Sequence, residues 1–285
     1  ISFSILNIAD LSTDGCYTLG FAVGATVTLA GHPLLALPAA MLAGACSGFV
    51  TAFLQTKLGV ESILAGIIVN TGLYTVNLAV MGWSSNLSIY GSDSLFTLCK
   101  ELFPWEWWAK WHELVVLAVI LLVAALLVVL FFRTRLGLSI RATGDNADMV
   151  RASSINPSFT ITVGLCLSNS LTGLAGCLIG LLNKSCDINL GTGMVTVALA
   201  SLIIGESLMG RGSIPRRVFG VILGACLYRI IIAVAISTSI VPTEGFKLVS
   251  ALIVAVAIAA PQGRKLIALQ RQKLAARKRG GGVKC

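Results

Sequence analysis

The sequence contains few charged residues: Asp, Glu, Lys and Arg together make up 12% of its 285 residues. Hydrophobic residues make up 56%, and the 29 glycines raise the apolar share to about two thirds. A soluble globular domain carries about 25% charged residues and about 45–50% apolar residues with glycine included. Because so little polar surface is available to face water, the composition excludes a soluble globular protein and predicts an integral membrane protein.

Common catalytic and metal-binding motifs are also absent from the sequence. There is no G-x-x-x-x-G-K-[ST] loop to bind the phosphates of ATP, no HExxH and no G-x-S-x-G. Only two histidines occur, and the eight cysteines include no C-x-x-C pair that would indicate a zinc site. We therefore expect neither an enzyme nor a bound cofactor or metal ion.

Long apolar runs recur along the chain. A helix needs about 20 mostly apolar residues to cross the roughly 30 Å core of a bilayer. This criterion gives eight candidate spans, at about 16–31, 34–54, 62–82, 114–132, 159–182, 194–209, 218–236 and 246–260. The predicted fold class is therefore all-α, a polytopic transmembrane helical bundle. We expect one transmembrane domain over residues 1–263 and a basic tail over residues 264–285.

Basic residues gather on one side of this predicted bundle. Sixteen of the 21 Lys and Arg residues lie in the loop 133–158, in the turn after the sixth span, at Lys57 or after Pro261. Cytoplasmic loops carry an excess of Lys and Arg, so this side and the C-terminus are predicted to be cytoplasmic, in a multi-pass protein of the cell (inner or plasma) membrane. A basic run is also typical of nucleic-acid-binding arms, but in a membrane chain we interpret it as a cytoplasmic tail and expect no nucleic acid partner.

The longest outward-facing segment, 83–113, is rich in tryptophan. Its five tryptophans are Trp83, Trp105, Trp107, Trp108 and Trp111. Tryptophan is enriched where membrane and water meet, so we expect an aromatic belt in contact with membrane lipid.

Small residues recur at a spacing of four within the predicted spans. The glycine pairs are Gly20/Gly24, Gly44/Gly48, Gly176/Gly180 and Gly220/Gly224. This spacing lets helix backbones approach closely in lipid, which predicts a compact bundle and says nothing about a substrate.

The polar residues that stand out within the predicted spans are Asn70, Asn77, Asn169, Glu206 and Arg229, the last with snorkelling to the membrane surface as its alternative. Polar groups in a membrane interior are costly and usually functional. Asn70 and Asn77 are seven residues apart and therefore share one helix face, with Thr71 and Tyr74 beside them. We expect these residues to form a polar seam that faces the bundle interior; ordinary hydrogen bonds between helices are the alternative for each of them.

The stretch before the first span carries Asp10, Ser12, Thr13, Asp14 and Gly15. This composition is poor for a helix interior and good for a break followed by an N-cap. Broken helices at membrane depth persist where they line a cavity. An ordinary loop at the membrane surface is the alternative.

The loop 133–158 contains signals for a short helix. Gly144-Asp145-Asn146 is typical of a turn and a cap, the following ADMVRA is long enough for about two helical turns, and Asn156-Pro157 ends it and starts the next span. Such a cytoplasmic helix, presenting Met149 and Val150 between charges, is typical of a docking element for a partner. A solvated connector is the alternative.

The same loop, RATGDNADMVRASSIN, together with LCLSNSLTGLAGCLIG, resembles the coupling region of ABC importer permeases of the branched-chain amino acid type. Four more stretches resemble one subgroup of that family, the amino-acid (tryptophan-like) uptake permeases: ILNIADLSTDG, ILAGIIVNTGLYTVNLAVMG, DINLGTGMVTVALASLIIGE and ILGACLYRIIIA. The similarity is collinear from about residue 5 to residue 260. Members of the subgroup have an additional helix before ILNIADL, so we expect some N-terminal sequence to be missing here.

The resemblance implies a permease subunit of an ATP-driven importer for a small solute. The expected solute is an amino acid. It implies a pathway formed by two copies, a cytoplasmic ATP-binding subunit that grips the short helix, and an extracytoplasmic substrate-binding protein. The coupling residues would be Asn146, Ala147, Asp148, Met149, Val150 and Arg151. The resemblance matches Asp10, Ser12, Asp14 and Gly15 to the family's re-entrant break near the pathway, Glu206 to its acid at the end of the sixth span, and Asp187, Gly191 and Gly193 to its outward loop. Together with Asn70, Asn77 and Asn169 of the polar seam, the break residues and Glu206 are the expected pathway residues. The alternative function is ion-coupled secondary transport through Glu206, Asp10 or Asp14.

Overall fold

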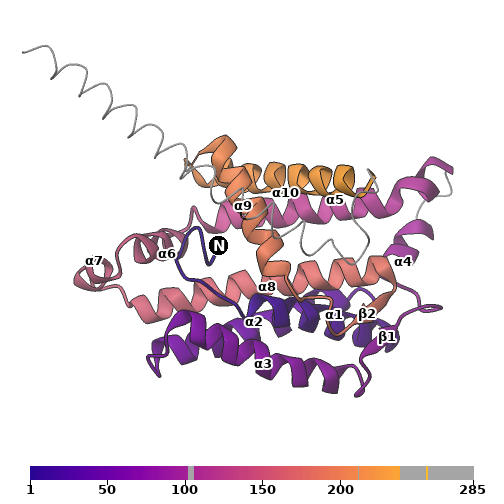
Figure 1. Ribbon diagram of the computed structural model, residues 1–285, viewed down its shortest axis with the longest axis horizontal. Coiled ribbons are helices and arrows are strands. Elements are labelled where there is room, and N and C mark those ends of the chain that lie inside the picture. The colour runs from indigo at the N-terminus through magenta and orange to yellow at the C-terminus, as the bar shows by residue number, and fades with distance from the viewer. Residues whose placement is uncertain (102–105, 211, 238–254, 256–285) are drawn as a thin grey trace, which may run out of the picture. The chain divides into compact units, whose positions relative to one another are not determined.

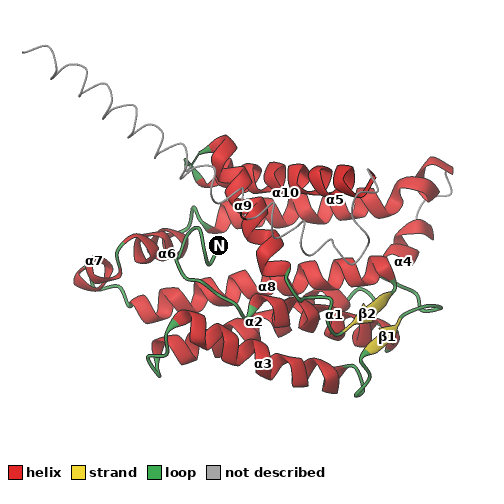
Figure 2. Cartoon of the chain, viewed as in Figure 1, coloured by secondary structure: helices red, strands yellow, loops and turns green. Residues whose placement is uncertain are grey.

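A computed structural model describes residues 1–101, 106–210, 212–237 and 255. The chain divides into two compact units, Ile1–Val195 and Thr196–Cys285, and each is described by itself. The described residues are helical apart from two short strands and the connecting loops (Figure 2). The predicted all-α fold class is confirmed.

The first unit contains eight helices and two strands among its described residues. They are α1 (Thr13–Leu29), α2 (Ala36–Thr56), α3 (Ser62–Val80), β1 (Asn86–Ser88), α4 (Leu95–Glu101), α5 (Glu106–Phe131), α6 (Arg135–Asp145), α7 (Ala147–Ala152), α8 (Pro157–Asn183) and β2 (Ser185–Asp187). The helix α9 (Met194–Met209) begins in the first unit and continues into the second, which also contains α10 (Ile214–Ser237).

Seven of the eight candidate spans coincide with described helices, and the eighth, 246–260, lies outside the described residues except for residue 255. Five of the described helices are long and apolar enough to cross a membrane: α2, α3, α5, α8 and α10. The helices α1 and α9 are shorter, with 17 and 16 residues. The protein is therefore a polytopic membrane protein, while the number of eight spans and the boundary at residue 263 stay predictions. The basic tail 264–285 lies outside the described residues.

The helix α8 is the centre of the first unit, with α1 and α2 packed against it and α3 packed against both of them (Figure 1). A Cβ atom added at Gly20 would overlap the backbone carbonyl of Gly173, and one added at Gly44 would overlap that of Asn169. The helix backbones therefore touch, which confirms the role of the spaced glycines in a compact bundle.

The helix α1 runs alongside only the second half of α8. Its Cys16 thiol lies 3.2 Å from the carbonyl oxygen of Asn169, close to the middle of the 27-residue α8, and Gly24 lies against Cys177 further along. The helix α1 therefore begins beside the middle of α8, after a non-helical segment over residues 1–12, while the position of this break within the membrane stays a prediction.

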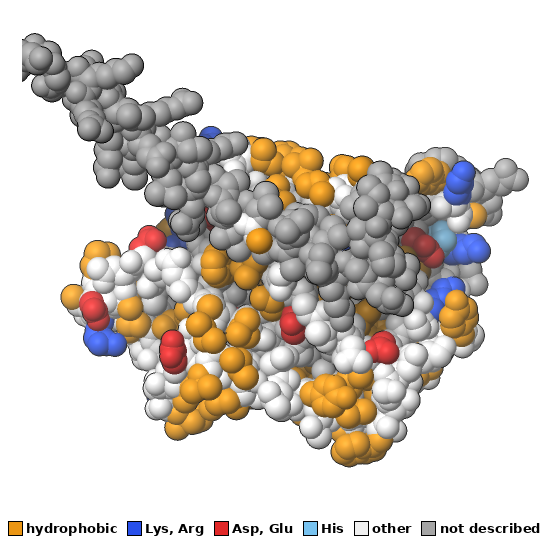
Figure 3. All heavy atoms as spheres, in the orientation of Figure 1, with side chains coloured by type: hydrophobic (Ala, Val, Ile, Leu, Met, Phe, Trp, Pro, Cys, Tyr) orange, Lys and Arg blue, Asp and Glu red, His pale blue; other side chains and the backbone are white. Residues whose placement is uncertain are grey.

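The helix α5 carries the most apolar stretch of the described chain. None of the residues in its most apolar 18-residue window is buried within the chain, so this surface is left to lipid or to another chain. Figure 3 shows hydrophobic side chains spread over the face drawn, with isolated charged groups between them.

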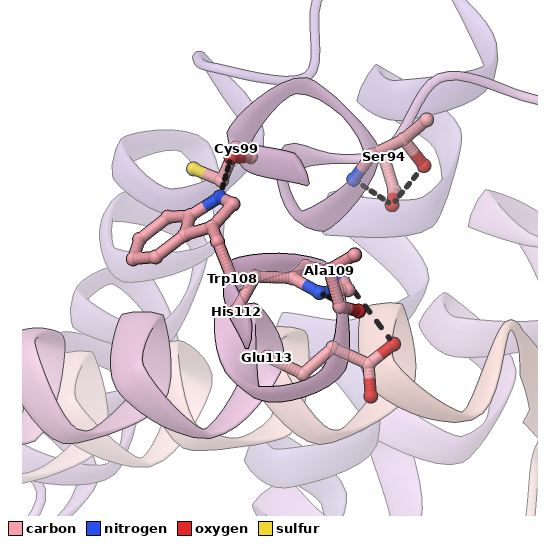
Figure 4. Close-up of polar contacts among 7 residues, drawn as sticks. Ser94, Cys99, Trp108, Ala109, His112 and Glu113 are labelled. Atoms are coloured by element: carbon pink, nitrogen blue, oxygen red, sulfur yellow. Dashed lines mark hydrogen bonds and ion pairs between the residues drawn. The ribbon is translucent and has the colours of Figure 1, made fainter. Parts of the chain in front are cut away.

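The short helix α4 is joined to the start of α5 by a tryptophan. The indole Nε1 of Trp108 donates a hydrogen bond of 2.8 Å to the carbonyl of Cys99 (Figure 4). Trp83 and Trp111 are exposed, and the side chains of Trp105 and Trp107 lie outside the described residues. The aromatic belt itself stays a prediction.

Two features of the first unit were not predicted. The segment treated as loop before the short helix forms α6, whose Thr134 cap accepts a hydrogen bond from the Gly137 N–H and whose Ile140 is buried. The strands β1 and β2 pair antiparallel with Leu87 opposite Cys186.

The thiol of Cys186 on β2 is unreactive at neutral pH. Burial raises the pKa of this thiol to about 12, and the neighbouring Asp187 carboxylate raises it as well, so the thiol stays protonated.

In the second unit, α9 and α10 pack through glycines. A Cβ atom at Gly205 would overlap the carbonyl of Gly220, and one at Gly224 would overlap that of Ser201. The predicted residue Glu206 lies in the last turn of α9 and is partly buried.

Candidate functional site

The break before α1 is held by a buried carboxylate. Asp10 Oδ1 accepts hydrogen bonds from the Ser12 backbone N–H (2.9 Å) and hydroxyl (2.6 Å), and Asp10 Oδ2 accepts one from Asn169 Nδ2 (3.1 Å). All three residues are buried. Asn169 Nδ2 also lies 3.3 Å from the Ser12 hydroxyl, so this buried cluster fixes the turn before α1 to the middle of α8.

A second carboxylate, one helical turn later, joins α1 to the start of α9. Asp14 Oδ2 accepts a hydrogen bond from the Gly193 N–H (3.0 Å), and Asp14 Oδ1 accepts one from the Val195 N–H (2.8 Å). The Thr18 hydroxyl accepts a third from the Gly191 N–H (3.1 Å). Gly193 adopts a φ of +85°, a left-handed conformation that favours glycine. The N-terminal ends of α1 and α9 therefore meet at Asp14.

A polar pocket of about 300 Å³ opens beside this junction. It lies between α1, α3 and the segment that precedes α9. Its lining residues are Asp14, Gly15, Thr18, Asn70, Thr71, Tyr74, Asn77, Ile188, Asn189 and Thr192. This volume is at the small end of the range for ligand-binding pockets.

Asn77 lines the pocket and is almost fully buried, with 1% of its surface exposed. Its Nδ2 donates a hydrogen bond of 3.1 Å to the carbonyl of Gly15, while its Oδ1 has no partner in the described structure. A Cβ atom at Gly15 would lie only 2.7 Å from Asn70 Oδ1, so glycine is needed for α1 and α3 to approach here.

The structure brings most of the predicted pathway residues into two neighbouring groups. Asp14, Gly15, Asn70 and Asn77 line the pocket, and Asp10, Ser12 and Asn169 form the buried cluster. The residue Glu206 lies in the second unit and belongs to neither group. Their role in translocation stays a prediction.

Sequence analysis missed four of the residues that line the pocket: Thr18, Ile188, Asn189 and Thr192. The segment DINLGTG did carry a signal, because Asp187, Gly191 and Gly193 were matched to an outward loop. Thr18 gave no sequence signal for the pocket, since a single threonine within an apolar run is ordinary in a membrane helix.

The predicted coupling helix is present as α7. Asn146 Oδ1 accepts hydrogen bonds from the N–H groups of Asp148 and Met149, both 3.0 Å, and so caps the helix. Met149 is 59% exposed, and Asp148 and Arg151 form an exposed ion pair of 4.0 Å. Val150 is only 1% exposed, so it packs inside the chain, and the prediction that it is presented beside Met149 is wrong.

The helices α6 and α7 are fixed to the rest of the first unit by buried contacts. The hydroxyls of Thr143 on α6 and Thr160 on α8 lie 2.8 Å apart, and the side chain of Val150 on α7 is buried. The side-chain amide of Asn7 donates a hydrogen bond of 2.8 Å to the carbonyl of Gly144. The exposed face of α7 is therefore presented by a segment that is packed against α8.

Comparison with known proteins identifies the family. The family described as "Branched-chain amino acid transport system / permease component" matches residues 1–258. The tyrosine transport system permease protein of Clostridioides difficile (strain R20291) is 31% identical over 255 residues, covering 89% of this chain and 82% of that protein.

Sugar permeases are also similar to the chain. The ribose import permease protein of Escherichia coli (strain K12) is 27% identical over 236 residues, covering 76% of this chain and 66% of that protein. The D-allose transport system permease protein of the same strain is 29% identical over 206 residues, covering 64% and 62%. No solved structure matches the chain. The chain belongs to the family of branched-chain amino acid transport system permease components, and it is a membrane-embedded permease subunit of an ABC importer.

Proposed function

We propose that this permease imports an amino acid, that two copies of the chain form the pathway, and that an ATP-binding subunit drives it by pressing on α7. The name of the tyrosine permease relative and its 31% identity over most of both chains support an amino acid as solute. An extracytoplasmic binding protein would deliver the solute, and α7 and the C-terminus would face the cytoplasm.

The form of α7 is the observation that carries this proposal. A six-residue helix has little stability of its own, so the Asn146 cap and the buried Val150 are needed to hold it. With the helix held in this way, Met149 and the ion pair between Asp148 and Arg151 are exposed. A flexible, polarisable methionine on a capped and packed helix fits an apolar groove on a partner.

The proposal is tested by uptake into proteoliposomes that contain the permease with its ATP-binding subunit, with the binding protein added outside. We expect ATP-dependent uptake of radiolabelled L-tyrosine or L-tryptophan. Met149→Ala removes the central docking side chain and should lower uptake and ATPase co-purification at least about tenfold.

The matched control is Leu138→Ala on α6, which also removes an exposed apolar side chain but lies outside α7. It should leave uptake unchanged. Normal co-purification and uptake with Met149→Ala would show that α7 is not the docking element. Uptake of D-ribose in place of amino acids would refute the proposed solute, and uptake that continues without ATP would refute the proposed coupling.

A further inference from the structure

The polar pocket beside Asp14 contains hydrogen-bond acceptors that the protein does not fully use. An ionised carboxylate has about four acceptor positions, and Asp14 uses two of them for backbone N–H groups. Asn77 Oδ1 is buried at the pocket wall without a partner. A buried acceptor without a donor is unfavourable, so a ligand that donates hydrogen bonds would stabilise this arrangement.

The described lining of the pocket carries a negative charge and no positive one. Asp14 is the only charged residue among the described residues that line it. Its carboxylate accepts hydrogen bonds from the backbone N–H groups of Gly193 and Val195, and no basic side chain is among the described lining residues. A cation would therefore be bound more favourably than a neutral or anionic group.

Two of the lining residues are less polar. Tyr74 on α3 is 50% exposed, and Ile188 lies in the segment before α9. An aromatic ring attracts a cation through its face and also packs against apolar groups. The lining thus combines an acidic side chain and amide acceptors with Tyr74 and Ile188, in a volume that suits a small solute.

We propose that this pocket binds the ammonium group of the transported solute, with Asp14 as its charge partner and Asn77 Oδ1 as a second acceptor. This inference rests on the proposed function, because it takes the solute to be an amino acid. A primary ammonium carries three donors, which match these acceptors. The hydroxyls of a neutral sugar would supply hydrogen bonds but would leave the charge of Asp14 without a counterion.

The test is ligand-observed saturation-transfer NMR on the full chain in lipid nanodiscs, without other subunits. The probes are tyramine and L-tyrosine, which carry an ammonium group, and 3-(4-hydroxyphenyl)propionate and D-ribose, which do not. We expect saturation transfer to tyramine and L-tyrosine alone. Asn70→Leu and Asn77→Leu, which remove polar groups from the wall, should weaken tyramine binding at least about tenfold.

Thr75→Val is the matched control, because it changes an exposed polar residue of α3 that does not line the pocket. It should leave tyramine binding unchanged. If Asn77→Leu does not fold, Asn70→Leu carries the test, since its side chain is only half-buried. Equal saturation transfer to the propionate or to ribose would overturn the inference. Displacement of tyramine by NaCl but not by choline chloride would assign the pocket to a metal cation and would overturn it too.

The two proposals fail in different ways. If tyramine does not bind while ATP-driven tyrosine uptake proceeds, the ammonium site is wrong and the proposed function stands. If tyramine binds as expected but uptake does not depend on ATP, the proposed function is wrong and the ammonium site stands.

Discussion

Asp10 and Asp14 lie one helical turn apart and have opposite environments. Asp10 is buried, and its donors come from its own turn and from the side chain of Asn169. Asp14 takes its donors from backbone groups 179 and 181 residues away, and it borders a pocket. The comparison shows that one carboxylate closes a structural joint, whereas the other keeps acceptor positions open to a ligand.

The largest effect on folding should come from Asp10→Ala. This change leaves the Ser12 hydroxyl and N–H buried without their acceptor and leaves the Asn169 amide with the Ser12 hydroxyl alone, which costs about 2–4 kcal/mol of unfolding free energy. The measurement is unfolding of the purified permease by SDS titration in mixed micelles.

A charge exchange provides the control for that change. In the double variant Asp10→Asn with Asn169→Asp, an amide and a carboxylate still face each other, so most of the lost stability should return. If the double variant loses as much unfolding free energy as Asp10→Ala does, the pair of Asp10 and Asn169 does not hold the turn before α1.

Asp14→Ala should have a smaller effect on folding and a larger one on transport. Water in the pocket can reach the freed N–H groups of Gly193 and Val195. We therefore expect a loss of only about 1–2 kcal/mol of unfolding free energy. Uptake should fall at least about tenfold, because both the charge and the position of the first turn of α9 are lost. A loss of stability as large as that of Asp10→Ala would remove the distinction between the two acids.

A third change, Gly191→Ala, acts through steric overlap alone. The added methyl group would overlap the backbone carbonyl of Asp14, which cannot move aside as a flexible side chain could, so we expect a loss of about 1–3 kcal/mol of unfolding free energy. Gly72→Ala on α3 is the control, since its methyl group would meet nothing within 4 Å. Uptake by Gly191→Ala at the level of Gly72→Ala would show that contact between this loop and α1 is not needed.

Features with local signals could be predicted from the sequence. The spans follow from apolar runs, and α7 follows from the cap and helix-forming residues at 146–152. The seven-residue spacing of Asn70 and Asn77 places both on one face of α3, and both line the pocket. The helix α6 was missed because its arginines and glycines obscure the single buried face around Ile140.

The pairing of distant residues could not be predicted. The bond between Asp10 and Asn169 joins positions 159 residues apart, and it depends on how closely α1 and α8 approach at their glycines. The same holds for Asp14 and Gly193. Val150 was assigned to the docking face because a six-residue helix gives no clear periodicity by which to tell its buried side.

The helix α8 is unbroken from its first turn, where Thr160 contacts Thr143, to its middle, where Asn169 contacts Asp10. At 1.5 Å per residue, Pro157 and Asn169 are about 18 Å apart along the axis. Under the proposed function, this unbroken helix would link α6 and α7, where the ATP-binding subunit acts, to the turn from which α1 departs.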